Sequence, residues 1–211
     1  MINKHEIDYT LYLVTDRRLM SCETIEESVS LAIDGGASVI QLREKDCSSR
    51  EFYELAVRVK KITEPRRVPL IINDRIDIAL AANADGVHLG QSDIPCKEAR
   101  KILGSDKLIG VSAALPEEAV QAQADGADYL GVGAVFSTQT KTNTRPVTPG
   151  IIRQIRSAVT IPFVVIGGIN SENIKQLYGL GINGAAVVSA VVAQPDITAA
   201  ARKMREAAKM L

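Results

Sequence analysis

The chain has 211 residues, of which 46% are hydrophobic and 24% are charged, a balance typical of a globular domain. Lys and Arg together number 25, as do Asp and Glu, so no overall positive charge favours nucleic acid or an anionic membrane. Aromatic residues make up only 4% and Trp is absent, which argues against a surface that stacks nucleic-acid bases.

Membrane, secretion and disulfide signals are not visible either. No apolar stretch approaches the ~20 residues of a membrane-spanning helix, and the polar segment 1–10 does not resemble a secretion signal. The cysteines Cys22, Cys47 and Cys96 are widely spaced, which favours neither a disulfide framework nor a zinc site. We therefore expect a cytoplasmic protein that acts on small molecules, not on nucleic acid or membranes; a homo-oligomer is left open.

Short apolar segments alternate with longer amphipathic segments along the chain. The predicted strands are Leu11–Thr15, Ser38–Leu42, Pro69–Asn73, Gly86–Gly90, Leu108–Ser112, Tyr129–Val135, Phe163–Gly167 and Gly184–Ser189. The predicted helices are Ile25–Asp34, Arg50–Thr63, Arg75–Ala82, Cys96–Leu103, Pro116–Asp125, Thr148–Ala158, Ser171–Leu180 and Ile197–Met210. The strands are almost continuously apolar, as expected when both faces of a sheet are covered by helices.

Glycine recurs between a predicted helix and the next strand, as in Asp34–Ala37 and Asp125–Asp128. A glycine there ends the helix in a left-handed conformation and turns the chain back. The repeated strand–helix unit predicts an α/β fold, a single (β/α)8 barrel domain over residues 1–211. The alternative is an open doubly wound sheet, which more naturally has about five or six strands.

In such a barrel the active site lies at the carboxyl ends of the strands. Gln41, Arg43 and Lys45 follow one predicted strand at intervals of two residues, so their side chains share one face. Arg and Lys are suited to binding phosphate oxygens. This strand end therefore predicts a phosphate site.

Two carboxylates, Asp74 and Asp93, follow the next two predicted strands. Mg²⁺ is commonly held by one or two carboxylates together with substrate phosphates. With Arg43, Lys45 and Lys141, the pair predicts a pyrophosphate bound with a metal ion. The alternative is a structural ion-pair network, for example Asp74 with Arg75 or Arg43.

A second anion site is predicted after the seventh and eighth strands, where barrels commonly bind phosphate through backbone N–H groups. Gly168 and Ser189 lie there. The polar segment Thr138–Thr144 predicts a loop that closes over phosphorylated ligands, or else a solvated loop. Asn73 either binds substrate or caps a turn, and we interpret His88 as a structural residue, not a base.

Motifs in a fixed order carry a resemblance to a known family. They are Tyr12-Leu13-Val14-Thr15-Asp16, Gln41-Leu42-Arg43-Glu44-Lys45, Ile72-Asn73-Asp74-Arg75, Asp85-Gly86-Val87-His88-Leu89-Gly90-Gln91-Ser92-Asp93, Gly110-Val111-Ser112, Val135-Phe136-Ser137-Thr138-Gln139-Thr140-Lys141, Ile166-Gly167-Gly168-Ile169 and Val187-Val188-Ser189-Ala190. Any one motif is a weak signal, but the ordered set resembles the thiamine-phosphate synthase family.

The resemblance implies a transferase that joins 4-amino-2-methyl-5-(diphosphooxymethyl)pyrimidine to thiazole phosphate, forming thiamine phosphate and pyrophosphate by a dissociative displacement. It implies a pyrimidine pyrophosphate site made of Gln41, Leu42, Arg43, Glu44, Lys45, Asn73, Ser112 and Lys141. It implies a thiazole phosphate site made of Thr138, Gln139, Thr140, Gly168, Val188 and Ser189. Asp74 and Asp93 would hold Mg²⁺, and the catalytic residues would be Arg43, Lys45, Ser112 and Lys141.

Three other functions are alternatives. The related thiazole tautomerase shares the barrel but typically lacks the Arg-Glu-Lys cations and the paired aspartates. A non-catalytic binding barrel would be expected to lose its charged site residues, which are present here. A sugar-phosphate epimerase or aldolase would need an acid–base pair or a Schiff-base lysine on a strand, and none is evident.

Overall fold

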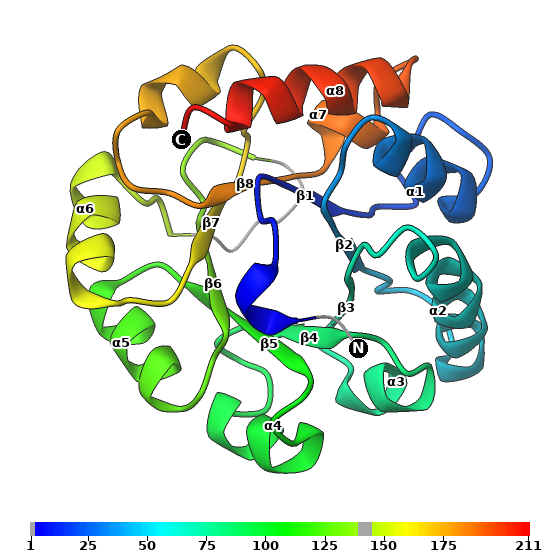
Figure 1. Ribbon diagram of the computed structural model, residues 1–211, viewed down its shortest axis with the longest axis horizontal. Coiled ribbons are helices and arrows are strands. Elements are labelled where there is room, and N and C mark those ends of the chain that lie inside the picture. Colours follow the sequence, from blue (N-terminus) through cyan, green and yellow to red (C-terminus); the bar gives the residue numbers. More distant parts are fainter. Residues whose placement is uncertain (1–2, 139–144) are drawn as a thin grey trace.

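The computed structural model describes residues 3–138 and 145–211, and its strands form a closed parallel barrel surrounded by helices (Figure 1). The strands are β1 Leu11–Val14, β2 Val39–Leu42, β3 Leu70–Asn73, β4 Gly86–Leu89, β5 Leu108–Ala113, β6 Tyr129–Gly133, β7 Phe163–Ile166 and β8 Gly184–Val187. Each strand pairs with the next, and β1 pairs with β8 through the register Leu13↔Val187. The predicted barrel is confirmed, and the open sheet is wrong.

The helices pack around the outside of the barrel. They are α1 Ile25–Asp34, α2 Ser49–Thr63, α3 Ile76–Ala81, α4 Cys96–Leu103, α5 Pro116–Ala124, α6 Pro149–Ala158, α7 Ser189–Val192 and α8 Ile197–Ala208, with 3-10 turns η1 Lys4–Glu6 and η2 Asn173–Leu177. The start of α2 is a capping box in which Ser48 Oγ accepts from Glu51 N, and Glu51 Oε2 accepts from Ser48 N. The cap is therefore Ser48, and the helix begins one residue before the predicted Arg50.

The segment between β7 and β8 differs from the prediction. The expected helix Ser171–Leu180 is only the short turn η2. Asn170 Oδ1 accepts hydrogen bonds from Glu172 N and Asn173 N, as a helix cap does. The segment nevertheless continues only as a 3-10 turn, which ends at the extended Tyr178 and the left-handed Gly179. The strand predicted to reach Ser189 ends at Val187, and the short helix α7 that begins at Ser189 was not predicted.

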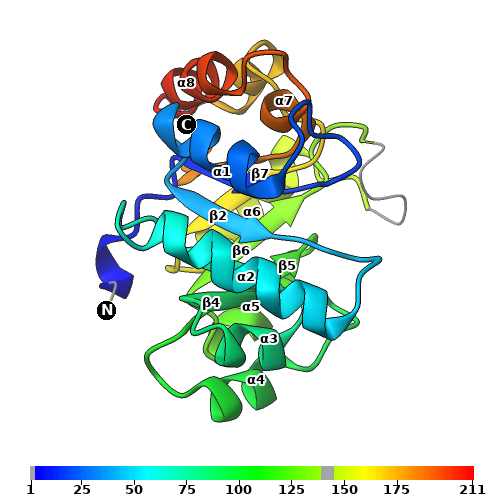
Figure 2. The same cartoon turned by 90° about the vertical axis from the view of Figure 1, so that its right-hand side faces the viewer.

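Two apolar layers fill the molecule. The larger layer lies between strands and helices, and the smaller one fills the barrel interior, where Tyr9, Tyr12 and Tyr129 are its largest side chains. The N-terminal segment crosses the end of the barrel opposite the strand tips (Figures 1 and 2). There the rings of Tyr9 and Tyr129 lie 5.1 Å apart, and Lys4 Nζ lies 3.1 Å from Asp128 Oδ1. This closed end leaves the carboxyl ends of the strands as the open mouth.

Within residues 3–138 and 145–211, no helix combines the length and the apolar character needed to span a bilayer.

Candidate active site

Three polar residues at the end of β2 lie progressively farther from the barrel interior. Gln41 is buried within the strand, and its Nε2 donates to Tyr12 OH at 2.8 Å. Arg43 and Lys45 follow the last strand residue, Leu42, and are half-buried and exposed respectively. The chain therefore presents an amide inside the barrel and two cations above it. Leu42 is fully buried in the layer facing the helices and packs away from the mouth.

Asp74 and Asp93 lie side by side at the mouth, next to Lys45. Lys45 Nζ donates to Asp74 Oδ2, and Asp93 Oδ2 accepts from Gly90 N at 2.7 Å. Burial raises the pKa of Asp93, and the charge of the neighbouring Asp74 carboxylate and a hydrogen bond with it raise that pKa further. The two aspartates thus form a carboxylate pair that a cation stabilises.

The ion-pair alternative can be compared with the observed partners. Arg75 binds Asp77 and Ser49, and Arg43 lies 3.5 Å from Asp16, so neither arginine is the partner of Asp74. Asp74 instead meets Lys45, and its backbone has a φ of +62°, while its N–H donates to His88 O at 2.9 Å. A left-handed Asp at a strand end is a conformational cost that this backbone contact helps to offset.

Asp74 and Asp93 are the carboxylates that this point of the mouth offers to a metal ion. Among the described ranges, no group of three or more His, Cys, Asp or Glu side chains is arranged to hold a metal ion. A site of two carboxylates nevertheless matches the way Mg²⁺ is held when phosphates and waters complete its coordination.

Consecutive residues after β1 pair with the loop after β2, a feature that the sequence analysis missed. Asp16 contacts Arg43, Arg17 Nε lies 3.1 Å from Glu44 Oε2, and Arg18 pairs with Asp46. The Glu44 side chain is only 5% exposed, and its Oε1 has no hydrogen-bond partner in the part of the chain that the structure describes. The only sequence signal was the run of three charged residues directly after a predicted strand.

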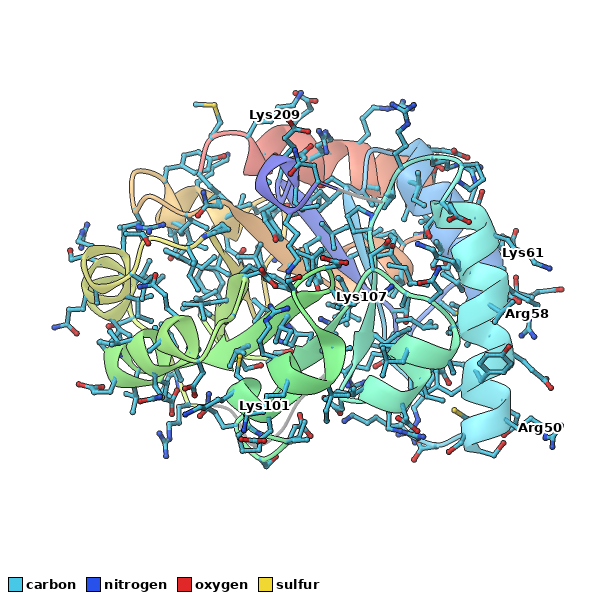
Figure 3. All side chains as sticks on the ribbon, turned by 60° about the horizontal axis from the view of Figure 1, so that its bottom comes forward. Arg50, Arg58, Lys61, Lys101, Lys107 and Lys209 are labelled. Carbon is cyan, nitrogen blue, oxygen red and sulfur yellow. The ribbon has the colours of Figure 1, made fainter. Side chains whose placement is uncertain are left out.

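A cavity of about 500 Å³ lies beside this paired segment and is lined by both loops and by α2. Arg43 and Lys45 contribute to it. By contrast, Arg50 and Lys61 of α2 are exposed on the outer side of the barrel (Figure 3). The mouth cations therefore differ from ordinary solvated charges on the helices.

Asn73 and Ser112 occupy the ends of β3 and β5. Asn73 is 9% exposed, so it is nearly enclosed at the base of the mouth. Ser112 Oγ lies 3.0 Å from His88 Nε2, and the Ser112 carbonyl accepts from Gln91 Nε2. Both residues belong to the same opening as Gln41.

The predicted phosphate site is partly described. Gly168 has a φ of +61°, and a Cβ there would lie 2.3 Å from Ser137 O, so only glycine fits this turn. Val188 caps α7 and Ser189 is its first residue, which places backbone N–H groups without helical partners at this point. Thr138 ends the described segment. Gln139, Thr140 and Lys141 lie outside the described residues.

Fold and site together define a class: a (β/α)8 barrel enzyme whose mouth carries cations, paired carboxylates and a glycine turn suited to phosphorylated small molecules.

Comparison with known proteins narrows this class. A family model described as thiamine monophosphate synthase matches residues 11–191, and the chain belongs to this family, a family of transferases.

Individual relatives agree with this assignment. The chain is 57% identical to thiamine-phosphate synthase of Clostridium beijerinckii over 96% of this chain and 97% of the relative. It is 58% identical to that of Ruminiclostridium cellulolyticum, with the same coverage. The structure of thiamine phosphate pyrophosphorylase from Pyrococcus furiosus matches with a TM-score of 0.89 at 38% identity, covering 96% of both chains. An N-acetylmannosamine-6-phosphate 2-epimerase from Clostridium perfringens, at 17% identity and a TM-score of 0.66, shares the fold alone.

Proposed function

We propose that this protein condenses 4-amino-2-methyl-5-(diphosphooxymethyl)pyrimidine with thiazole phosphate to form thiamine phosphate and pyrophosphate. The observation that carries the proposal is the meeting of Lys45, Asp74 and Asp93 at the barrel mouth, beside Arg43. Cations and adjacent carboxylates suit a pyrophosphate bound with a metal ion, and the names of the relatives point to the same reaction.

Arg43 and Lys45 would stabilise pyrophosphate as it leaves. In the proposed dissociative reaction the C–O bond breaks and pyrophosphate leaves with the electron pair, so negative charge grows on its oxygens. Arg43 and Lys45 are held at the mouth before substrate arrives, by Asp16 and Asp74 respectively. Preorganised cations stabilise developing charge with little rearrangement. The thiazole nitrogen then attacks the pyrimidine-methyl cation and forms the C–N bond.

The carboxylate pair fits Mg²⁺ as its resident cofactor. The Asp74 carboxylate is close enough to Asp93 to disfavour the charged form of Asp93, an arrangement that a divalent cation relieves. When bound, Mg²⁺ would supply positive charge to the pyrophosphate. Its removal with a chelator is expected to abolish turnover.

No side-chain nucleophile is required by this scheme. Cys47 lines the cavity beside the mouth, but burial and the nearby Glu44 and Glu51 raise the pKa of its thiol, which keeps it protonated and poorly nucleophilic. The work of the enzyme is then positioning and charge stabilisation.

The second substrate is assigned to the turn after β7 and the start of α7. The close fit around Gly168 and the N–H groups at Val188 and Ser189 support a phosphate monoester there. We propose that Thr138, Gln139 and Thr140 complete this site. Ser112 and Lys141 are proposed to act on the pyrimidine side.

The test is to mix purified protein with both substrates and Mg²⁺ and to measure thiamine phosphate and pyrophosphate in equal amounts. Isomerisation of thiazole phosphate without condensation would instead identify a tautomerase. Lys141→Ala is expected to lower kcat more than the affinity for thiazole phosphate; an effect confined to that affinity would contradict its role at the pyrophosphate.

A cytoplasmic location is proposed as well, because the chain has no overall charge bias and its cysteines are free among the described residues. A homo-oligomer stays a prediction, which size-exclusion chromatography with light scattering tests.

A further inference from the structure

Polar side chains from neighbouring and distant strands form one continuous chain of hydrogen bonds inside the barrel. Gln41 Nε2 lies 2.8 Å from Tyr12 OH, and Tyr12 OH lies 2.8 Å from Tyr129 OH. Tyr129 OH lies 3.2 Å from His88 Nδ1, and His88 Nε2 lies 3.0 Å from Ser112 Oγ. We call these five residues the relay. Its ends are site residues, whereas its three middle members were not expected to take part.

The strands are shaped to accommodate the relay. A Cβ on Gly110 would lie 2.1 Å from Tyr129 Cζ and 2.6 Å from His88 Nδ1. A Cβ on Gly131 would lie 2.9 Å from His88 Cε1. Two strand glycines thus leave room for one imidazole and one phenol, although glycine weakens a strand. A barrel interior filled with small apolar side chains would have been simpler than one that contains these polar groups.

Each member of the relay has a defined number of protons to donate. Tyr12 and Tyr129 are fully buried, and burial raises the pKa of both, so both remain neutral hydroxyls with one proton each. A neutral imidazole donates from one nitrogen and accepts at the other. Once Tyr12 donates its single proton along the chain, the directions of the other hydrogen bonds follow.

The first hydrogen bond runs from the Gln41 amide nitrogen to Tyr12 OH. In the arrangement that gives the buried Tyr12 proton an acceptor, Tyr12 donates to Tyr129, and Tyr129 donates to His88 Nδ1. The imidazole proton consequently sits on Nε2 and is donated to Ser112 Oγ. At the two ends, Gln41 keeps its carbonyl oxygen as an acceptor, and Ser112 keeps its hydroxyl proton as a donor.

We propose that Tyr12, Tyr129 and His88 are positioning residues that set the hydrogen-bonding polarity of Gln41 and Ser112 toward the aminopyrimidine ring of the substrate. This inference rests on the proposed function for the identity of the ring. An aminopyrimidine offers an amino donor and ring-nitrogen acceptors, which match a Gln oxygen and a Ser hydroxyl proton. The analogue with an oxo group in place of the amino group presents an acceptor to Gln41 and is disfavoured, so the relay is a specificity device.

The relay direction is measured without substrate. The chain has two histidines, so ¹⁵N spectra of the imidazole nitrogens are assigned by comparison with His5→Gln. We expect His88 as one neutral tautomer with its proton on Nε2, and a tautomer mixture in Tyr129→Phe. A proton on Nδ1 in the unchanged protein would reverse the relay and overturn the proposal. This result is readable even if the wild-type protein forms no thiamine phosphate, so failure of the relay and failure of the proposed function are distinguishable.

The specificity is measured as the ratio of kcat/KM for the amino substrate to that for its 4-oxo analogue. In Tyr12→Phe, Gln41 loses its fixed partner and its amide can turn, so we expect the ratio to fall about tenfold, the effect of one hydrogen bond. The intrinsic reactivities of the two substrates are the same for every variant and cancel in the comparison.

The matched control is Tyr9→Phe. Tyr9 is buried in the same aromatic cluster, with its ring 5.1 Å from that of Tyr129, but it makes none of the relay hydrogen bonds. It is expected to keep the ratio within about twofold of wild type. A ratio unchanged in Tyr12→Phe, or lowered equally in Tyr9→Phe, would reduce the relay to core packing. If Tyr12→Phe does not fold, the ¹⁵N measurement on the unchanged protein still decides the question.

Discussion

Arg17 and Arg18 are adjacent, and each pairs with an acidic residue after β2, but the two acids differ in burial. The Glu44 side chain is 5% exposed, whereas the Asp46 side chain is 67% exposed. Arg17→Met therefore leaves a buried carboxylate without its cation, whereas Arg18→Met leaves one in water. The two substitutions are a matched pair, and we expect very different effects on stability.

The expected losses of folding stability follow from how exposed the side chains of each ion pair are. Removing one member of a buried ion pair costs ~3–5 kcal/mol, and removing an exposed pair costs ~0–1 kcal/mol. Arg17 is itself 56% exposed, so water can reach Glu44 when the guanidinium is removed. We therefore expect a loss of about 2 kcal/mol for Arg17→Met, between these limits. At ~2–4 °C per kcal/mol, Arg17→Met should lower Tm by ~4–8 °C and Arg18→Met by at most ~4 °C.

Thermal unfolding followed by circular dichroism, at one pH and salt concentration, measures both variants. The double variant Arg17→Met/Glu44→Gln should recover much of the loss, because it leaves no buried charge unpaired. Since Glu44 lies between Arg43 and Lys45, Arg17→Met should also raise KM for the pyrimidine pyrophosphate. Equal losses in Arg17→Met and Arg18→Met, or no recovery in the double variant, would refute the reasoning.

Other predictions concern separate parts of the site. Asp93→Asn should raise Tm in metal-free buffer, because a raised carboxyl pKa means that the charged form of Asp93 opposes folding at neutral pH; this opposition fades as pH falls through that pKa. The variant should also lose Mg²⁺-dependent turnover. A lower Tm in metal-free buffer would contradict the repulsion between Asp74 and Asp93. Gly168→Ala should cost more than about 1 kcal/mol and raise KM for thiazole phosphate alone in steady-state kinetics, since its Cβ would meet Ser137 O. Cys96, whose pKa burial raises to about 11, should react slowly with iodoacetamide at pH 8 and faster as pH approaches that value; labelling of the folded protein at pH 8 as fast as Cys22 would refute its burial.

The strands and most helices were predictable because their signals are local. An apolar run between Pro69 and Asp74 defines β3, one between Gly86 and Gly90 defines β4, and a capping residue with an amphipathic pattern defines α2. The exceptions are also local in origin. At η2 the capped segment is only a short 3-10 turn that ends at the extended Tyr178 and the left-handed Gly179, and at α7 an apolar segment of four residues carries no helical period.

The candidate site was predictable only as a set of residues at strand ends. Which of them touch depends on barrel closure and strand register, which bring residues far apart in sequence together. Asp74 meets Lys45, 29 residues away, and not its neighbour Arg75. The sequence likewise gives no signal that Glu44 is buried, because burial depends on how the loops after β1 and β2 pack together.

The Gln41–Lys45 segment shows this division most clearly. The sequence by itself determined that an amide and two cations leave a strand end in an eight-stranded barrel, since alternation and composition are properties of the chain. Only the tertiary structure decided that a chain of hydrogen bonds runs from Gln41 through Tyr12, Tyr129 and His88 to Ser112. The physical reason is that these residues come from five strands, and a hydrogen bond between strands exists only once the barrel has closed at one register.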